Sequence, residues 1–182
     1  MRDPEDIHDE WLVLRCQEGD AAALTELVER WQSRLWRQAM RLTGDSDAAH
    51  DVVQQAWLAI VRGLDRLTDA ACFRRWAYQI VTYKSADWIR ERQRERAQKN
   101  AIAAKPGEQP APTTDATDDV ELLREALKEL SPDQRTALSM FYLEQMPLAE
   151  IAHVLSLPVG TVKSRLHYAR HELKTVLERK MR

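Results

Sequence analysis

A proline-containing segment in the middle of the chain limits the folds that this sequence can adopt. Residues 97–118 read AQKNAIAAKPGEQPAPTTDATD, with three prolines, many small side chains and no apolar periodicity. This composition is typical of a flexible linker rather than of a packed element. A chain of 182 residues is long enough for two small domains. We therefore expect one domain at 1–96 and a second at 119–182, tethered by a linker of about 22 residues that reaches roughly 75 Å when extended.

Both halves show the apolar spacing of α-helices. Leu24, Leu27, Trp31 and Leu35, for example, recur every three or four residues along one helix face. Glycine occurs only five times, aromatic residues make up 7% of the chain, and no run alternates with period two as a strand would. We expect an all-α protein of two small helical domains. Caps included, the expected helices span residues 10–18, 21–42, 45–64 and 68–96 in the first half, and 120–130, 131–143, 148–155 and 161–180 in the second.

Short polar residues mark where several of these helices begin. Asp45 and Thr68 stand at the positions of N-caps for the third and fourth helices. Ser131, Pro132 and Gln134 combine a capping hydroxyl, a proline at the first helical position and an amide three residues after the cap. This is the pattern of a capping box, and it predicts a well-defined helix start.

The distribution of charge is more informative than its total. The formal net charge is -2, which does not by itself suggest a nucleic-acid partner. However, residues 1–30 are rich in Asp and Glu, whereas the last 25 residues carry mostly Lys and Arg. A basic segment on one helix is typical either of a phosphate-binding surface or of an ordinary solvated face, and charge alone does not separate the two.

Other features exclude several classes of protein. Cys16 and Cys72 lie far apart without metal-ligand spacing, which favours two reduced thiols in a cytosolic chain. No apolar stretch approaches the roughly 18 residues of a membrane span, and the acidic N-terminus lacks the apolar core of a signal peptide, so we expect a cytoplasmic protein. A glycine-rich phosphate loop, an HExxH pair and a nucleophile elbow are all missing from the sequence. We expect no enzyme activity, no cofactor and no metal site.

Residues 148–177 have the organisation of a helix-turn-helix. A short helix containing the small Ala152 is followed by a turn at 156–160 that contains Pro158 and Gly160, and then by a long helix, which the fixed φ of Pro158 helps to start. The small side chain allows two helices to cross closely. The apolar stripe of the long helix, at helical spacing, consists of Val162, Leu166, Ala169, Leu173, Val176 and Leu177.

The opposite face of the long helix is polar and basic. In a helix-turn-helix, the N-terminal part of the second helix enters the major groove, so Lys163, Ser164 and His167 are the candidate base-contacting residues. Side chains at the flanks are better placed for phosphates, which position a protein without specifying sequence. The alternative is an ordinary helical hairpin, which does not require this turn, this small residue and this basic face together. The full candidate set is Thr161, Lys163, Ser164, Arg165, His167, Arg170 and Lys174.

The sequence resembles bacterial sigma factors in both halves. EIA…L…PVGTVKSRL…AR..L, at 150–173, resembles sigma region 4, most closely that of the extracytoplasmic-function (ECF) group, although LuxR-type regulators carry a related motif. DSDAAHDVVQQAWLAIVRGL, at 45–64, resembles region 2.2, and FRRWAYQIVTYKSADWIRERQRER, at 73–96, resembles regions 2.3 and 2.4. The resemblance covers nearly the whole chain outside the linker and the N-terminal tail. It implies a protein that binds core RNA polymerase and directs it to promoters, reading the -35 element with its C-terminal domain and the -10 element with its N-terminal domain.

The resemblance also implies a polymerase-binding site. Asp51, Gln54 and Gln55 match the helix that docks on the polymerase in this family. Gln55 and His50 stand where family members often carry acidic residues, which predicts an altered polymerase contact. Judged by residue type alone, the same polar group beside Trp57 fits a solvated helix face equally well.

A second face is implied for the -10 element on the helix at 68–96. Its predicted apolar stripe consists of Phe73, Ala77, Ile80, Val81 and Trp88. Aromatic side chains on the opposite face can replace lost base stacking, worth about 1–3 kcal/mol per base. Tyr83 stands where the family usually has Asn, so the resemblance does not predict which base of the -10 element is preferred. Trp76 fits a core position as well as a DNA contact. The candidate residues are Arg75, Trp76, Gln79, Thr82, Tyr83 and Arg90.

These patterns leave three hypotheses. The first is a sigma factor whose partners are core RNA polymerase and promoter DNA, with an anti-sigma factor as a further partner and no membrane insertion. The second is a stand-alone helix-turn-helix transcriptional regulator, which would need a sensor or dimerisation half that the first 96 residues do not resemble. The third is a helical interaction protein that does not read DNA, against which the basic face argues.

Overall fold

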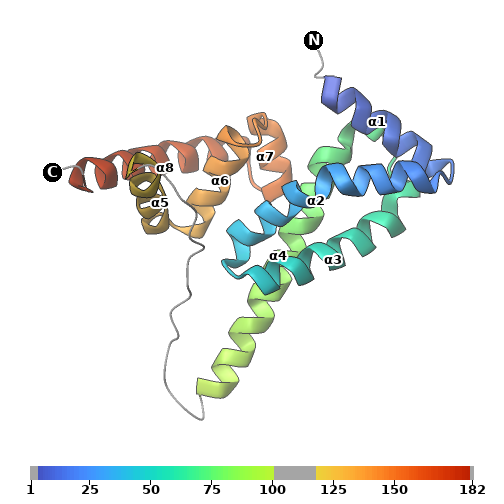
Figure 1. Cartoon of the computed structure of the whole chain (residues 1–182). Helices are drawn as coiled ribbons and strands as arrows, with labels where there is room; N and C mark the ends of the chain where they lie inside the picture. Colours follow the sequence, from blue (N-terminus) through green and yellow to red (C-terminus); the bar gives the residue numbers. More distant parts are fainter. Residues whose placement is uncertain (1–3, 101–117, 181–182) are drawn as a thin grey trace. The chain divides into compact units, whose positions relative to one another are not determined.

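The described part of the chain is helical throughout. The computed structural model describes residues 4–100 and 118–180, and every regular element in these ranges is a helix, so the predicted all-α class is confirmed (Figure 1). The chain divides into two compact units, Met1–Pro106 and Gly107–Arg182. Of the predicted linker at 97–118, residues 101–117 lie outside the described part. No helix in the described ranges is both long and apolar enough to cross a membrane.

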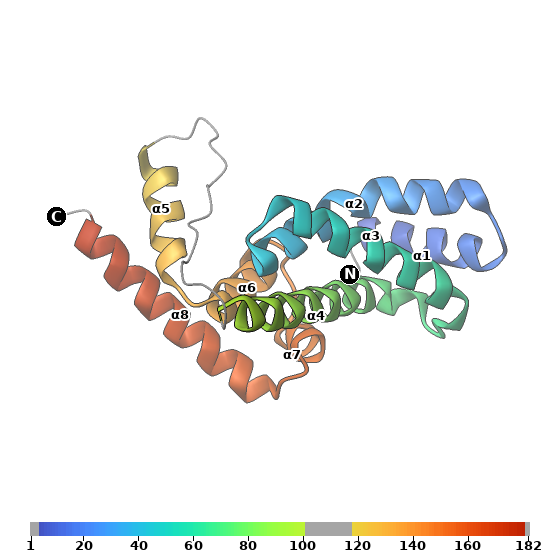
Figure 2. The same ribbon diagram turned by 90° about the horizontal axis from the view of Figure 1, so that it is seen from below.

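The first unit is built around three long helices. Helices α2, α3 and α4 pack against one another in pairs, and α1 packs on α2 and reaches the turn before α4. Both views show α2, α3 and α4 side by side, and the C-terminal half of α4 extends beyond the other two (Figures 1 and 2). The elements are α1 (Pro4–Gln17), α2 (Ala21–Thr43), α3 (Ser46–Gly63), the 3-10 turns η1 (Leu64–Arg66) and η2 (Ala70–Cys72), and α4 (Phe73–Asn100).

Aromatic packing fixes α4 on α2. Trp31 of α2 is fully buried, and its ring lies edge-on to Phe73 at 5.2 Å and to Tyr78 at 5.9 Å, measured between ring centroids. Each such contact contributes about 0.5–1.5 kcal/mol beyond simple burial. The buried face of α4 differs from the predicted stripe, because the helix is held by both α2 and α3. Tyr78 and Ser85 are buried beside Phe73, Ala77 and Val81, whereas Ile80 and Trp88 are only half-buried.

Aspartate side chains cap α2, α3 and η2 in the first unit. Asp45 caps α3 as predicted, accepting hydrogen bonds from the backbone N–H groups of Asp47 and Ala48 at 3.0 Å. The predicted cap at Thr68 is wrong. Asp69 instead accepts from the N–H of Ala71 at 3.1 Å and caps η2, which leads directly into α4. A 3-10 turn precedes the helix, so the cap belongs to that turn.

Two helix lengths also differ from the prediction. Helix α1 begins at Pro4, six residues earlier than expected. Ion pairs of Glu5 with Arg34 and of Asp9 with Arg30 hold the added turns on α2. Helix α4 continues to Asn100 rather than to 96. The added stretch contains Ala, Gln and Lys, which are good helix formers.

The second unit places one long helix against three short ones. Helix α8 packs against α5, α6 and α7. The capping box at the start of α6 is confirmed: the N–H of Gln134 donates to the Ser131 hydroxyl at 3.3 Å, and the N–H of Ser131 donates to Oε1 of Gln134 at 2.8 Å. The elements are α5 (Asp118–Glu129), α6 (Pro132–Tyr142), α7 (Leu148–Leu155) and α8 (Val159–Lys180).

Candidate nucleic-acid interface

A tight turn joins α7 to α8. Ser156 ends α7 in the left-handed conformation, with φ 54° and ψ 44°, and its N–H reaches the carbonyl oxygens of Ala152 and His153. The N–H of Leu157 also donates to the carbonyl oxygen of Ala152, at 2.9 Å. The turn predicted at 156–160 is present but ends two residues earlier, because α8 begins at Val159. Pro158 starts α8 as predicted, since its carbonyl oxygen accepts from the N–H groups of Thr161 and Val162. Gly160 lies within the first turn of α8, where an added Cβ would meet nothing within 4 Å.

Buried apolar side chains fix α8 against α7. Val162, Leu166 and Ala169 of α8 are at most 4% exposed, and Ile151 and Ala152 of α7 are buried opposite them in the same unit. Leu173 and Leu177, which the sequence placed on the same stripe, are half-buried. The seam determines the rotation of α8 about its own axis. It therefore also determines which side chains point outward.

The predicted base-contacting residues are on the outer face. Thr161, Lys163, Ser164 and His167 are all exposed. The hydroxyl of Ser164 donates back to the carbonyl oxygens of Gly160 and Thr161 at 3.1 and 3.0 Å, so in this arrangement it offers a ligand only acceptor capacity. Lys163 and His167 lie four residues apart, which places them one above the other on the same face of the first turns of α8.

Acidic side chains of the same unit neutralise part of the basic C-terminal segment. Arg165 is only 21% exposed and forms an ion pair with Asp133 of α6 at 2.8 Å. Lys174 approaches Glu178 to 3.7 Å, and Arg179 pairs with Glu129 of α5. Among the described residues, Lys163 and Arg170 take part in no ion pair; Arg170 donates from Nε to the carbonyl oxygen of Leu166 at 3.2 Å. The cationic surface is therefore smaller than the count of Lys and Arg in the sequence suggests.

The predicted -10 residues all lie on α4, with different degrees of exposure. Tyr83 is 50% exposed and Arg90 is exposed, with its guanidinium 2.5 Å from Asp87. Thr82 is half-buried and its hydroxyl donates to the carbonyl oxygen of Tyr78 at 2.8 Å. Gln79 is half-buried as well.

The N-terminal turn of α4 holds its two remaining candidates in defined positions. Arg75 donates to Sγ of Cys72 at 3.0 Å. Trp76 is half-buried, and its ring packs on Gly63 so closely that a Cβ there would lie 2.9 Å from Cζ2. Trp76 therefore fits both predicted alternatives, a core position and a DNA contact, because it packs on Gly63 and remains partly exposed.

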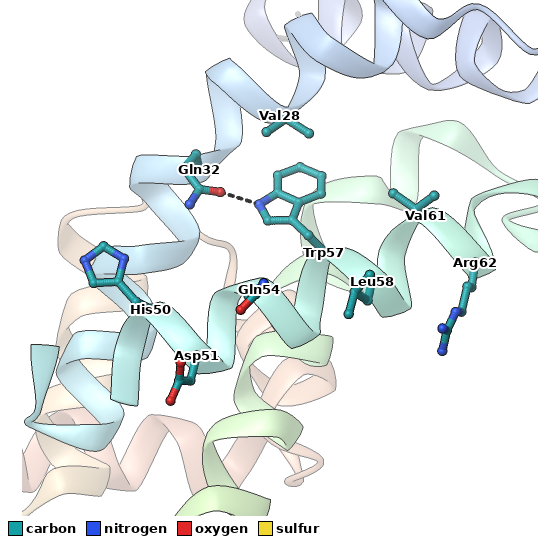
Figure 3. A pocket seen from close by; sticks show the side chains of 9 residues that line it. All are labelled: Val28, Gln32, His50, Asp51, Gln54, Trp57, Leu58, Val61 and Arg62. Carbon is teal, nitrogen blue, oxygen red and sulfur yellow. Dashed lines mark hydrogen bonds between the residues drawn. The ribbon is translucent and has the colours of Figure 1, made fainter. Parts of the chain in front are cut away.

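A groove lies on the outer side of α2 and α3. It encloses about 580 Å³ and is lined by Asp51 and Gln54, two of the predicted polymerase-binding residues (Figure 3). Gln55 is exposed but is not part of the lining. The remaining lining residues are Val28, Gln32, His50, Trp57, Leu58, Val61 and Arg62.

The apolar part of this groove was missed by the sequence reasoning. Leu58 and Val61 are 54% and 45% exposed, and Trp57 donates from Nε1 to Oε1 of Gln32 at 2.6 Å, which fixes its indole in the wall. A signal was present. Leu58 and Val61 are apolar residues three apart, outside the buried pattern of α3, and such a pair marks a surface that a partner can cover.

Comparison with known proteins identifies the family. Residues 27–95 match the description "Sigma-70 region 2", and residues 120–173 match "Sigma-70, region 4". The chain is 31% identical over 167 residues to the ECF RNA polymerase sigma factor SigL of Mycobacterium tuberculosis, covering 88% of this chain and 92% of the relative. The chain belongs to the ECF group of the sigma-70 family. As an ECF sigma factor it directs promoter-specific transcription, so the first hypothesis drawn from the sequence is confirmed.

Other relatives agree with this family. The chain is 29% identical over 180 residues to the ECF RNA polymerase sigma-E factor of Escherichia coli, covering 93% of this chain and 94% of the relative. The fold resembles that of the sigma factor RpoE solved in complex with the anti-sigma factor NepR from Bartonella quintana, with a TM-score of 0.72, 22% identity and coverage of 85% and 96% of the two chains. It also resembles CnrH solved with the cytosolic domain of CnrY, with a TM-score of 0.67, 24% identity and coverage of 94% and 97%.

Proposed function

We propose that this ECF sigma factor reads the -35 element with the exposed face of α8. The observation that carries the proposal is the opposition of two faces on one helix. Val162, Leu166 and Ala169 are buried on one side, and Lys163 and His167 are exposed on the other. A helix held rigidly from behind can present polar groups to base edges in a fixed register.

Phosphate contacts complete the -35 interface in this proposal. Arg170 and Lys174 flank the reading face and would contact the DNA backbone, with Thr161 at the start of the helix. Arg165 can join them only by giving up or sharing its ion pair with Asp133. Because phosphate contacts carry no sequence information, these residues set affinity and salt dependence rather than promoter choice.

We assign the -10 element to α4. Tyr83 and Arg90 are exposed, and the half-buried Trp76 keeps part of its ring at the surface. Arg75, Gln79 and Thr82 complete the face. An exposed aromatic ring can stack on a base that has left the duplex, which offsets part of the cost of melting, a few kcal/mol per base.

Core RNA polymerase is proposed to dock on the groove between α2 and α3. Asp51 and Gln54 supply polar contacts at its edge, Gln55 lies beside it, and Leu58 and Val61 supply apolar area. The polymerase would then carry out the chemistry, so this chain needs no catalytic residue or cofactor of its own and acts in the cytoplasm. We also propose an anti-sigma factor as a partner, since the similar sigma factor RpoE was solved in complex with the anti-sigma factor NepR.

The two units are proposed to act as separate domains, 1–96 and 119–182, joined by the segment 97–118. Because α4 continues to Asn100 and α5 begins at Asp118, the 17 residues at 101–117 form the tether between the helices. At full extension they span up to roughly 60 Å, or somewhat less than two turns of duplex at roughly 34–36 Å each. This reach is sufficient for one domain at each promoter element.

Run-off transcription with core polymerase and a panel of candidate promoters tests the proposal. The wild-type chain should produce transcripts from specific start sites, and paired substitution of Asp51 and Leu58 by Ala should reduce them by weakening polymerase binding. Asp65→Ala, at an exposed carboxylate on η1 outside the groove, is the matched control and should leave transcription unchanged. DNA binding without polymerase-dependent transcripts would support a stand-alone regulator instead.

A further inference from the structure

Two histidines lie one turn apart on the outer face of α8. His167 and His171 are both exposed, and their four-residue separation places their Cβ atoms about 5–6 Å from each other on the same face. Two imidazoles at this spacing can reach one metal ion, since a nitrogen–zinc distance is about 2.0–2.1 Å. The same spacing on a helix supplies the two histidines of many zinc sites.

We propose that His167 and His171 bind one divalent transition-metal ion on the DNA-facing side of α8. Imidazole nitrogen suits Zn²⁺, Ni²⁺ and Cu²⁺, whereas Mg²⁺ prefers oxygen ligands. Within 4–100 and 118–180, no group of three or more His, Cys, Asp or Glu side chains could hold a metal. The ion would therefore have two protein ligands and complete its coordination with water.

The surroundings of the pair determine how tightly it holds an ion. The ring of His167 lies edge-on to the ring of Tyr168, with centroids 5.7 Å apart, and both side chains are exposed. Lys163, one turn before His167, opposes a bound cation, while Lys174 after His171 is partly neutralised by Glu178 at 3.7 Å. Two neutral ligands beside a lysine favour a reversible site, weaker than a closed four-ligand structural site.

A bound ion would change DNA reading. This consequence rests on the proposed function, in which His167 contacts a base. A metal-bound imidazole nitrogen no longer has a lone pair to accept a hydrogen bond. The ion and its water shell also occupy space between the helix and the base edges when α8 enters the major groove. We expect lower discrimination between -35 sequences, whereas the phosphate-driven part of binding persists because the ion adds positive charge.

Titration of the full-length, tag-free chain with Ni²⁺ tests the site directly. Calorimetry should show one ion per chain, and the imidazole NMR signals of His167 and His171 should respond together. Joining two ligands on one scaffold raises affinity by about 100-fold or more, so His167→Ala and His171→Ala should each lower it by about that factor. His153→Ala removes an exposed histidine on α7 and should have no effect. Wild-type affinity in His171→Ala, or an equal loss in His153→Ala, would overturn the proposal.

A second measurement separates this inference from the proposed function. Binding to promoter and scrambled duplexes is compared for the wild type and His171→Ala, with Ni²⁺ and with excess chelator. The wild type should lose promoter preference only with Ni²⁺, and His171→Ala should keep it in both conditions. A wild type without preference even in chelator contradicts the -35 assignment, and a preference that Ni²⁺ leaves unchanged contradicts the metal effect. The calorimetric result decides the site in either case.

Discussion

Truncating Leu166 should destabilise the second unit without affecting the first. Leu166 is 4% exposed and lies in the seam that holds α8. Leu→Ala removes the equivalent of about three methylene groups, or about 2.4 kcal/mol of transfer free energy at about 0.8 kcal/mol each. The cavity left behind brings the usual cost to about 2–5 kcal/mol.

This loss is large compared with the stability that the unit can have. Residues 118–180 form its described part, and at roughly 0.05–0.15 kcal/mol per residue these 63 residues would have a free energy of unfolding of about 3–9 kcal/mol. A domain of this size loses about 4–8 °C in Tm for each kcal/mol. We expect Leu166→Ala to lower the Tm of the second unit by at least about 10 °C.

The distribution of tryptophan makes the assay selective. All six tryptophans belong to the first unit, so indole fluorescence reports only on that unit, whereas circular dichroism reports on both. Leu166→Ala should split the dichroism melt while the fluorescence transition stays in place. Leu143→Ala makes the same change at a leucine that is 67% exposed and should shift neither transition measurably. An equal shift of the fluorescence transition in Leu166→Ala would show that the two units unfold as one body and would refute the reasoning.

Three further perturbations follow from contacts in the structure. Gly63→Ala places a Cβ 2.9 Å from Cζ2 of Trp76, which should cost about 1–3 kcal/mol by overpacking and alter indole fluorescence in urea unfolding; unchanged spectra and stability would contradict the close contact. A hydrogen bond from Arg179 lowers the pKa of Glu129. The stabilising effect of this pair is therefore present above the ordinary carboxyl pKa and is lost as pH falls through the lowered value. Glu129→Gln should flatten the acid limb of a stability profile monitored by circular dichroism, and an unaltered limb would argue against this pair. Asp133→Asn should release Arg165 and raise both DNA affinity and the salt slope, the latter by about 1, whereas a fall in affinity would show that the ion pair helps DNA binding.

Local signals in the sequence predicted much of the fold. The caps at Asp45 and Ser131 depend on residues two or three positions away, and both were predicted correctly. The period of α8 predicted its buried residues Val162, Leu166 and Ala169 for the same reason. The error at Thr68 arose because a 3-10 turn, which apolar periodicity does not reveal, precedes α4.

Features that depend on the tertiary structure were not predictable in this way. The count of Lys and Arg near the C-terminus could not show that Arg165 pairs with Asp133 or that Arg179 pairs with Glu129, because these partners are 32 and 50 residues away. The apolar part of the groove was missed for a related reason. The spacing of Leu58 and Val61 outside the buried stripe of α3 is a weak signal in the sequence, and the structure shows that both side chains are exposed in the groove.

The most direct test is a -35 specificity profile of α8 variants. Affinity is measured for the wild type and for Lys163→Ala, His167→Ala and Lys174→Ala on duplexes in which each base pair of the element is changed in turn, at several salt concentrations. Lys163→Ala and His167→Ala should each flatten the preference at particular positions by about 1–3 kcal/mol, and Lys174→Ala should weaken all duplexes equally and reduce the salt slope. If Lys163→Ala leaves both the preference and the affinity unchanged, the exposed face of α8 is not the surface that reads the promoter.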